Sequence, residues 1–360
     1  MIGDSIGRKG SPARLRSPNE EVSAKLSLKH RFVLAVARLL ITARHPMLVM
    51  RFARRIGYLP NPAAPEAYNE RMLWRKIIDH NPLFVTLSDK LAAKDHVRRA
   101  CPELMVPRTL WRGRDPGQIP DELLAGDVVA KTNHGCEMNI FVSNGQPDRA
   151  TIIRKLKRWL GRRYGRRLGE WAYWPIVPEA FVEEMLPLSG GRIATEIKVQ
   201  VCSGVVCHVR AEDKKARMSR LFDPDGNPLP GRDIDYPRED QALPVTPRLV
   251  EYVRQAAIIA PSIAGDLDYV RVDFLVTDER LYAGEVTVYS AAGYATWSNP
   301  AIMADIERRW RLDRSDFLQR RHTGLVRLYA DALRSKYGKE GGDPGQARPA
   351  DAASLRGLRA

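Results

Sequence analysis

The chain has 360 residues, 44% of them hydrophobic and 28% charged, which suits a globular protein with about two or three lobes. Its four cysteines show neither CxxC spacing nor the density of a disulfide framework, so a reducing cytoplasm is expected. The formal net charge is +15, and residues 1–60 alone hold twelve Lys and Arg against three Asp and Glu. We therefore expect a basic arm on a nearly balanced body, with phosphates, anionic lipid or acidic polymers as partners.

The N-terminal region predicts disorder to about residue 25 and helices from about 26 to 58, where arginines alternate with apolar residues. Pro46 should break the helical region in two, and no apolar run between arginines reaches the length of a membrane span. A basic amphipathic segment can lie on an anionic membrane, so we expect a cytoplasmic protein that makes peripheral contact with the inner face of the membrane. Packing of both helices on the protein's own core is an equal alternative. No cleavable secretion signal is expected.

A Pro-rich linker at 59–67 marks a domain boundary, and a helix from Asn69 to about His80 should follow it. Its expected buried stripe is Met72, Leu73, Trp74, Ile77 and Ile78. A second helix is predicted over 87–100, with Ser88 as its N-cap and Lys90 in its first turn. A cation there opposes the helix dipole, so Lys90 indicates either a nearby anion such as a phosphate or simply an exposed lysine.

A buried strand over 128–131 runs into the polar turn 132–135, and a second strand restarts at Asn139. Lys131 ends the first strand, where an ammonium beside turn N–H groups can hold a polyphosphate. The pattern is not a Walker A loop. His134 in the turn either contacts phosphate or hydrogen-bonds to backbone.

Residues 151–167 predict a strongly basic helix without a single acid. Its cations are Arg154, Lys155, Lys157, Arg158, Arg162, Arg163, Arg166 and Arg167. This excess favours an anionic partner, including an acidic substrate. Nucleic acid ranks lower, although Arg and aromatic residues alternate, because no nucleic-acid module motif is present.

Residues 174–209 predict a strand, a turn and two antiparallel strands. Glu183 and Glu184 end the first strand, where acids can bind an adenine amino group or ribose hydroxyls, and Leu186 follows to pack on a base. Glu196 shares a face with Lys198 in the next strand.

Residues 211–231 predict a cationic loop that closes over a substrate, and a helix should follow over 246–265. We expect Lys215 to reach a reacting phosphate, with a solvated lysine as the alternative. Beyond a polar loop at 290–300, residues 301–336 predict basic helices, and the tail from Gly338 predicts disorder.

Residues 269–288 predict a hairpin of two short alternating strands joined by the turn 277–280. In the first strand, Val270, Val272, Phe274 and Val276 share the apolar face, opposite Arg271 and Asp273. In the second strand, Tyr282, Val286 and Val288 should face the apolar side, opposite Ala283, Glu285 and Thr287.

A three- or five-residue hairpin loop would place Asp273 directly opposite Glu285, whereas a two-residue loop would place them on opposite faces. Two facing carboxylates are destabilising unless a cation lies between them, and Mg²⁺ is the hard divalent cation most suited to oxygen ligands. The alternative is the solvated face of an ordinary hairpin.

Six motifs follow one another along the chain: YNERMLW, SDK, AKTNHG, FVEEML, RVDF and AGEVTVY. This order resembles the TupA-like branch of the ATP-grasp superfamily, which is linked to bacterial cell-surface polysaccharide synthesis, over about residues 60–300. The resemblance implies an α+β ATP-grasp fold in which two α+β lobes enclose the nucleotide, preceded by a basic helical N-terminal segment.

The expected domains are the arm 1–60, the catalytic region 61–336 and the tail 337–360. Within the catalytic region we expect an N-terminal subdomain (61–125), a nucleotide-binding lobe (126–188) and a metal and substrate lobe (189–336).

The resemblance also implies roles for individual residues, with ATP and Mg²⁺ as cofactors. The implied nucleotide-binding residues are Lys90, Lys131, His134, Gly135, Glu183, Glu184, Leu186 and Glu196. Mg²⁺ would be held by Asp273 and Glu285. Thr287 stands where the wider superfamily often has a metal-binding Asn, and its hydroxyl is a poorer ligand. Arg271 would stabilise the transferring phosphate, together with Lys215.

The implied reaction is that of an ATP-dependent carboxylate–amine ligase, in which a substrate carboxylate attacks the γ-phosphate and an amine captures the acylphosphate. An acidic sugar, amino acid or surface polymer would be the substrate, in cell-envelope polysaccharide biosynthesis or modification. The alternatives are a sugar or polysaccharide kinase or other transferase on the same scaffold, and a non-catalytic polyanion- or membrane-binding protein. No nucleotide-sugar motif supports a glycosyltransferase.

Overall fold

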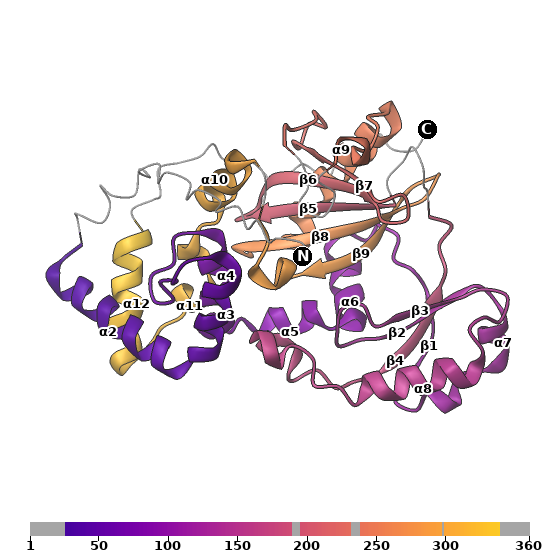
Figure 1. Ribbon diagram of the computed structural model, residues 1–360, viewed down its shortest axis with the longest axis horizontal. Coiled ribbons are helices and arrows are strands. Elements are labelled where there is room, and N and C mark those ends of the chain that lie inside the picture. Colours follow the sequence, from indigo (N-terminus) through magenta and orange to yellow (C-terminus); the bar gives the residue numbers. More distant parts are fainter. Residues whose placement is uncertain (1–25, 189–194, 232–237, 297–298, 339–360) are drawn as a thin grey trace, which may run out of the picture.

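The computed structural model describes residues 26–188, 195–231, 238–296 and 299–338 of the chain. This part consists of two antiparallel sheets, which lie one above the other in Figure 1, and of helices that cover them and extend to one side. The predictions of disorder for residues 1–25 and for the tail concern segments outside the described residues, apart from Gly338, which caps the last helix.

The smaller sheet has the strand order β1-β4-β2-β3, and all its strands are antiparallel. The strands are β1 (Thr109–Gly113), β2 (Val128–Thr132), β3 (Asn139–Val142) and β4 (Ala180–Glu184). Helices α7 (Asp121–Ala125) and α8 (Arg149–Leu160) cover it, and Ile152 and Leu156 of α8 are fully buried against the strands. The predicted strands on either side of the 132–135 turn, and the strand that ends at Glu184, are confirmed.

The basic helix is shorter than predicted. It ends at Leu160, and the chain continues as a loop with one 3-10 turn, η2 (Arg166–Leu168). Gly165 and Gly169 flank this turn with positive φ angles, which interrupt a helix. The second half of the basic run is therefore a loop that projects beside the smaller sheet.

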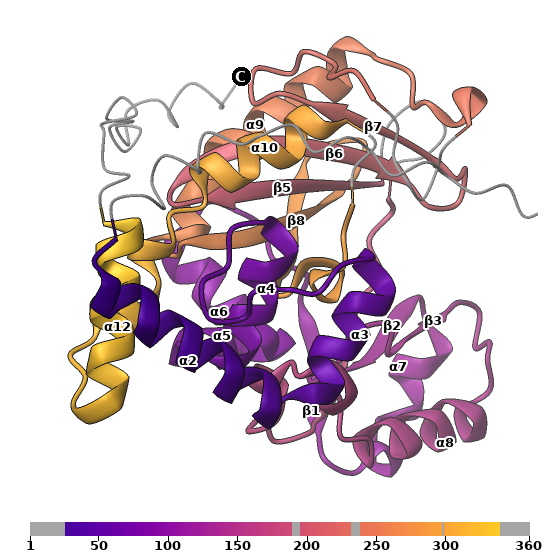
Figure 2. The same ribbon diagram turned by 60° about the vertical axis from the view of Figure 1, so that its left-hand side comes forward.

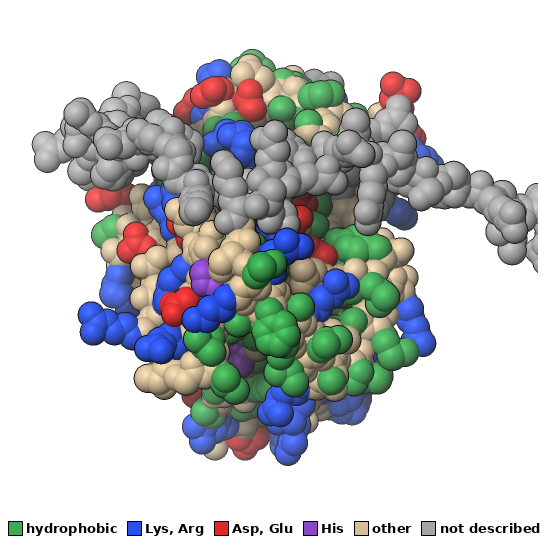
Figure 3. All heavy atoms as spheres, turned by 90° about the vertical axis from the view of Figure 1, so that its left-hand side faces the viewer, with side chains coloured by type: hydrophobic (Ala, Val, Ile, Leu, Met, Phe, Trp, Pro, Cys, Tyr) green, Lys and Arg blue, Asp and Glu red, His purple; other side chains and the backbone are tan. Residues whose placement is uncertain are grey.

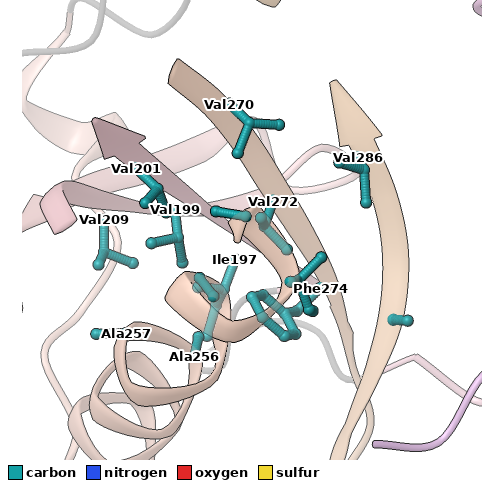
Figure 4. Packing of buried hydrophobic residues seen from close by; sticks show 14 of the residues in the cluster. Ile197, Val199, Val201, Val209, Ala256, Ala257, Val270, Val272, Phe274 and Val286 are labelled. Atoms are coloured by element: carbon teal, nitrogen blue, oxygen red, sulfur yellow. The ribbon is translucent and has the colours of Figure 1, made fainter. Parts of the chain in front are cut away.

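The larger sheet has the order β7-β6-β5-β8-β9. Its strands are β5 (Glu196–Cys202), β6 (Val205–Asp213), β7 (Met218–Phe222), β8 (Tyr269–Val276) and β9 (Leu281–Thr287). Helix α9 (Pro247–Ala264) packs across one face, and Figure 4 shows its Ala256 and Ala257 directed toward Ile197, Val199 and Phe274. Branched apolar side chains at every second position thus build the main core.

The segment predicted as the cationic loop 211–231 begins as regular structure. Residues 211–213 belong to β6, and after a tight turn β7 pairs back antiparallel against it. In β7 the half-buried Met218 and Arg220 alternate with the buried Ser219 and Leu221, a strand pattern that the concentration of charges concealed.

The β8–β9 hairpin pairs Asp273 directly with Glu285 and turns at 277–280, both as predicted, but the pairing does not arise from a three- or five-residue loop. Val276 pairs with Leu281, so the loop has four residues, and a bulge at Gly284 restores the register. A Cβ on Gly284 would lie 2.8 Å from the backbone oxygen of Asp273, so only glycine fits there.

The bulge also reverses the predicted faces of the first half of β9. Ala283 pairs with Phe274 and packs in the core, whereas Tyr282 pairs with Leu275 on the outer face. The predicted faces of β8 are confirmed, because Val270, Val272, Phe274 and Val276 all belong to the core.

Three helices precede the smaller sheet: α4 (Tyr68–Ile77), α5 (Pro82–Ser88) and α6 (Lys90–Ala100). Helix α4 ends before the predicted His80 and is buried on almost every side, including its cations Arg71, Arg75 and Lys76. The predicted cap of the second helix is wrong. Ser88 ends α5, and Asp89 caps α6 by accepting from the N–H of Leu91 at 2.9 Å.

The N-terminal helices are α2 (Leu28–Arg44) and α3 (Pro46–Ile56), and the predicted break at Pro46 is confirmed. The predicted C-terminal helical region is divided into α10 (Pro300–Arg309), η6 (Leu312–Arg314), α11 (Asp316–Gln319) and α12 (Gly324–Tyr337). Helix α2 packs along α12, as Figure 2 shows. Among the described residues no single helix has the length and apolar character of a membrane span; α2 and α3 reach it only together, across a bend of 96°.

Candidate functional site

A cavity of about 390 Å³ lies between the two sheets, lined by β2 and β4 from one side and by β5, β8 and β9 from the other. Helix α6 closes it with Lys90 and Lys94. The cavity brings together nine of the predicted site residues: Lys90, Lys131, Glu183, Glu184, Leu186, Glu196, Arg271, Asp273 and Glu285. A cleft between two lobes with convergent charged groups is the usual form of a ligand site.

Four predicted site residues do not line this cavity. His134 is buried, and its Nε2 lies 3.2 Å from the carbonyl oxygen of Arg162, so it takes the backbone-bonded alternative. Gly135 packs closely, since a Cβ there would lie 2.9 Å from the Met138 sulfur. Lys215 is exposed in the β6–β7 turn, and the neighbouring Lys214 lines the cavity instead.

The fourth is Thr287, which pairs with Arg271 across the β8–β9 ladder. Its Oγ1 accepts a hydrogen bond from Arg271 Nη2 at 3.1 Å and lines a neighbouring cavity. A role for Thr287 as a metal ligand remains a prediction.

Each member of the facing acid pair is held by a cation. Arg271 donates to both oxygens of Asp273, at 2.6 and 2.7 Å, and Lys90 Nζ lies 2.7 Å from Glu285 Oε1. Burial alone would raise the pKa of Glu285, but Lys90, Arg271 and Lys131 outweigh it and lower that pKa to about 2. Lys90 is the first residue of α6, so Glu285 is the anion that offsets its unfavourable position in the helix dipole.

The opposite wall repeats this pattern around Glu183. Its carboxylate accepts from Lys131 through one oxygen and from Lys94, at 2.7 Å, through the other. Burial favours the neutral acid, but the two ammonium groups lower the pKa of Glu183 below its ordinary value. Sequence reasoning missed Lys94, although it follows Lys90 by four residues and therefore shares its helix face.

A second residue that the sequence did not reveal is Asn133, in the turn after β2. Its backbone oxygen accepts from the N–H of Lys90 at 2.9 Å, and its side chain donates to Asp89 and accepts from the N–H of Glu179. Asn133 thus fastens the start of α6 to the end of β2. This link fixes the positions of Lys90 and Lys131 relative to each other.

The far end of the cavity carries a third charged group on the larger sheet. Glu196 accepts from Lys214 at 2.6 Å, and Lys198 pairs with both Glu196 and Glu212. At the edge of the smaller sheet, Arg108 holds Glu184 through its guanidinium and through its backbone N–H, both at 2.8 Å. The lining therefore alternates in sign, which suits a ligand that has both phosphate oxygens and hydrogen-bond donors.

The donor set fits a magnesium ion. The described residues contain no cluster of three or more His, Cys, Asp or Glu, so the candidate site is the pair Asp273 and Glu285 alone. Mg²⁺ binds proteins through one or two carboxylates and takes its other ligands from substrate phosphates and water. Two facing carboxylates on the wall of a lysine-lined cavity meet that requirement.

The sequence profile described as TupA-like ATPgrasp matches residues 70–303, which is more than half of the chain. The chain belongs to the TupA-like ATP-grasp family. The two-lobed α+β architecture is thus an ATP-grasp fold, and the cavity occupies the space between its lobes. No curated protein matches the sequence.

Among solved structures, a D-alanine–D-alanine ligase from Bacillus anthracis complexed with ATP shares 14% identity with a TM-score of 0.38, covering 71% of this chain and 67% of that one. The ATP-grasp ligase PsnB complexed with minimal precursor shares 16% with a TM-score of 0.33, covering 72% and 63%. The VanG D-Ala:D-Ser ligase from Enterococcus faecalis shares 15% with a TM-score of 0.36, covering 70% and 62%. The chain thus spans less than two thirds of the latter two.

Proposed function

We propose that this ATP-grasp protein is an ATP-dependent carboxylate–amine ligase that acts through an acylphosphate. Its substrate would be an acid used in cell-surface polysaccharide biosynthesis or modification, on the cytoplasmic side of the membrane. One observation carries the proposal: Lys90, Lys131, Arg271 and the Asp273–Glu285 pair converge on one cavity between the two sheets of an ATP-grasp fold.

The ion pairs on the two walls of this cavity can exchange partners. Lys90 and Lys131 bind carboxylates now, and both side chains reach the cavity, so a triphosphate can take those hydrogen bonds over. Asp273 and Glu285 would then hold Mg²⁺, which when bound neutralises phosphate charge and orients the phosphate oxygens. When Lys131 turns to the phosphate, Glu183 keeps its ion pair with Lys94.

The reaction requires no nucleophilic side chain. A carboxylate oxygen of the substrate attacks the γ-phosphorus, the bond to ADP breaks, and an acylphosphate forms. The amine nitrogen of the second substrate then attacks the acyl carbon, phosphate leaves, and the nitrogen loses a proton to give the amide. Arg271 lies beside the acid pair, where its guanidinium can stabilise the charge on the transferred phosphoryl group.

The nucleotide site is tested first, by thermal unfolding with and without Mg·ATP. At about 100 times the dissociation constant, binding should add about 2.7 kcal/mol to the stability of the native protein. Asp273→Asn should lose this shift, whereas Glu279→Gln, which removes a charge from the exposed turn of the same hairpin, should keep it. No shift of the unmodified protein at millimolar ATP would overturn the proposal.

The reaction type is tested by hydroxylamine trapping in the presence of Mg·ATP and a series of acids. A ligase that forms an acylphosphate gives a hydroxamate with its own acid and releases ADP. Transfer of phosphate to a sugar hydroxyl, with no hydroxamate formed, would instead identify a kinase on the same site.

A further inference from the structure

A second cavity, of about 780 Å³, adjoins the first. The two share Cys136, Glu137 and Met138 from the loop before β3, and both are lined by Arg271. The second cavity continues past Thr287 to the loop of η2. A molecule in it can therefore reach Arg271, which holds Asp273 of the acid pair.

Four guanidinium groups on one loop give this cavity its character: Arg162, Arg163, Arg166 and Arg167. We call them the arginine loop. Within the part of the chain that the structure describes, none of the four forms an ion pair with a carboxylate, although Arg166 lies over the ring of Trp174 at 5.8 Å. Two carboxylates, Glu137 and Glu170, line the same cavity, so the arginines outnumber the acids.

The arginine loop has a fixed shape. The backbone oxygen of Gly165 accepts from the N–H groups of Leu168 and Glu170, and Tyr164 packs edge-to-face on Tyr173 at 4.8 Å. Gly165 has a φ of 74°, and a Cβ there would lie 2.7 Å from the backbone oxygen of Glu170. A rigid loop that presents several guanidinium groups loses little entropy when it binds carboxylates.

The buried wall of the cavity offers a different group. Glu170 is 4% exposed, and its Oε2 has no hydrogen-bond partner among the described residues. A buried oxygen of this kind is stabilised by a donor such as a hydroxyl or amine of a ligand. The cavity therefore combines anion-binding groups at its outer end with an acceptor at its inner wall.

We propose that the second cavity binds the acid substrate, and that this acid carries at least one further anionic group besides the reacting carboxylate. The reacting carboxylate lies toward Arg271, and the further anionic group binds the arginine loop. The assignment of the reacting end rests on the proposed ligase function, whereas binding of a polyanionic acid by the arginine loop does not.

The proposal is tested by calorimetric titration of the full-length protein with tricarballylate, digalacturonate and the neutral galactobiose, at constant ionic strength and without nucleotide. Arg163→Gln combined with Arg167→Gln removes two cavity charges. Lys155→Gln combined with Arg158→Gln is the matched control, because it removes two exposed charges from α8 that do not line the cavity. Loss of two charge-assisted contacts should weaken binding of the acids by at least about tenfold in the first variant only.

Equal weakening in both double variants would show diffuse attraction by positive charge and would overturn the proposal. So would failure of the unmodified protein to bind either acid, or binding of galactobiose as tight as that of digalacturonate. The Mg·ATP thermal shift of the same variants reports on the nucleotide site separately. If the protein binds the acids but shows no thermal shift with Mg·ATP, this inference is supported and the proposed ligase function is contradicted.

A second inference rests on a separate surface, which we call the apolar helix face. It consists of large exposed side chains on α2 and α3: Leu28, Phe32, Leu39, Leu40, Met47 and Met50. Phe32 and Leu39 are 70% and 72% exposed. Figure 3 views the side of the molecule on which these helices lie and shows hydrophobic side chains gathered there, with Lys and Arg around them. The opposite stripe of α2, with Leu34, packs against α12.

The charge around this face has a single sign. Residues 26–65 contain no Asp or Glu, and the exposed cations of both helices are Lys29, Arg31, Arg38, Arg44, Arg54 and Arg55. A second copy of the chain would bring this positive surface against itself. An anionic bilayer instead offers apolar depth for the large side chains and negative headgroups for the cations.

We infer that the apolar helix face docks the protein on an anionic lipid bilayer, with α2 and α3 lying in the interface. The inference is independent of the reaction. It is tested by sedimentation of the full-length protein with vesicles of phosphatidylcholine alone or mixed with phosphatidylglycerol.

Phe32→Ser combined with Leu39→Ser should reduce binding to the anionic vesicles by at least about tenfold, because burial of these two side chains is lost. Val245→Ser combined with Ile258→Ser, at exposed apolar positions on the larger lobe, should leave binding unchanged. The inference is wrong if the unmodified protein does not bind anionic vesicles, or if the first variant binds as well as the control. A dimer that dissociates only in the first variant would show that a second copy covers the face.

Discussion

Two groups of ion pairs in this protein differ in their exposure. We call the buried group sealed and the group that faces the cavity open. In the sealed group, Arg75 of α4 pairs with Asp268, and the two side chains are 1% and 2% exposed. Arg75 also donates to the backbone oxygens of Tyr269 and Val288, and Trp310 donates to Asp268. These bonds tie the helices before the smaller sheet to the ends of β8 and β9.

In the open group, Lys90 and Glu285 are 22% and 36% exposed and face the cavity. They do not share the dense set of backbone bonds that surrounds Arg75, so a phosphate or a metal ion can replace either partner. The two groups are both paired and differ in burial, so burial rather than pairing decides which charges a ligand can reach. Only charges that a ligand can reach are able to change partners.

The largest expected effect is on stability, from Arg75→Met. It leaves the buried Asp268 carboxylate without its cation, which should cost about 3–5 kcal/mol of unfolding free energy. Urea unfolding measures the loss. Arg98→Met is the control, because the Arg98–Asp95 pair is exposed and should contribute less than about 1 kcal/mol. Similar losses in both variants would contradict the distinction between sealed and open pairs.

The second prediction concerns an open pair. Lys131→Met should weaken Mg·ATP binding by about 10- to 100-fold, since one charge-assisted hydrogen bond to phosphate is lost. Its urea stability should change by less than about 1 kcal/mol, because Glu183 keeps its bond to Lys94. A variant that binds Mg·ATP normally but unfolds more easily would place Lys131 among the structural charges.

The sequence identified the open charges better than the geometry that arranges them. Lys131, Glu183 and Asp273 each lie in a strand that the sequence predicted, and the structure brings all three to one cavity. Register was harder, because the bulge at Gly284 depends on the approach of a carbonyl from the neighbouring strand. Likewise, Lys214 rather than Lys215 lines the cavity because of the direction in which each residue of the β6–β7 turn points, which the sequence does not specify.

The sealed group was less accessible to sequence reasoning. The buried stripe predicted for helix α4 included none of its cations, and the structure buries Arg71, Arg75 and Lys76 among partners more than 190 residues away. A charged residue in a helix predicts solvent exposure unless its partner is known. That partner is supplied only by the folded chain.

The third prediction uses the bulge that places the open acid pair. Gly284→Ala forces a Cβ against the Asp273 carbonyl, so the strands must separate or shift, which should cost about 1–3 kcal/mol. The Mg-dependent ATP shift should also fall, because Asp273 and Glu285 lose their direct pairing. Gly126→Ala is the control, since its nearest neighbour lies 4.0 Å from the added Cβ. Unchanged Mg·ATP binding in Gly284→Ala would show that the direct pairing of Asp273 with Glu285 is not needed for metal binding.

The last prediction concerns the pH dependence of the sealed group. Asp79 lies buried near Arg75, and burial together with the neighbouring Asp268 raises the pKa of Asp79 to about 7. In the unfolded chain this carboxyl ionises near its ordinary value of 3.8. Between these two values the native state binds more protons than the unfolded state, so the contribution of Asp79 to stability falls as the pH rises.

Asp79→Asn should therefore flatten the decline in stability between about pH 4 and about pH 7. Urea unfolding of both proteins across this range measures the difference. Glu285 acts in the opposite sense, because its pKa is lowered to about 2 and its contribution is lost as the pH falls below its ordinary value. If the stability of Asp79→Asn declines with pH as steeply as that of the unmodified protein, a proton on Asp79 does not contribute to the pH dependence of stability.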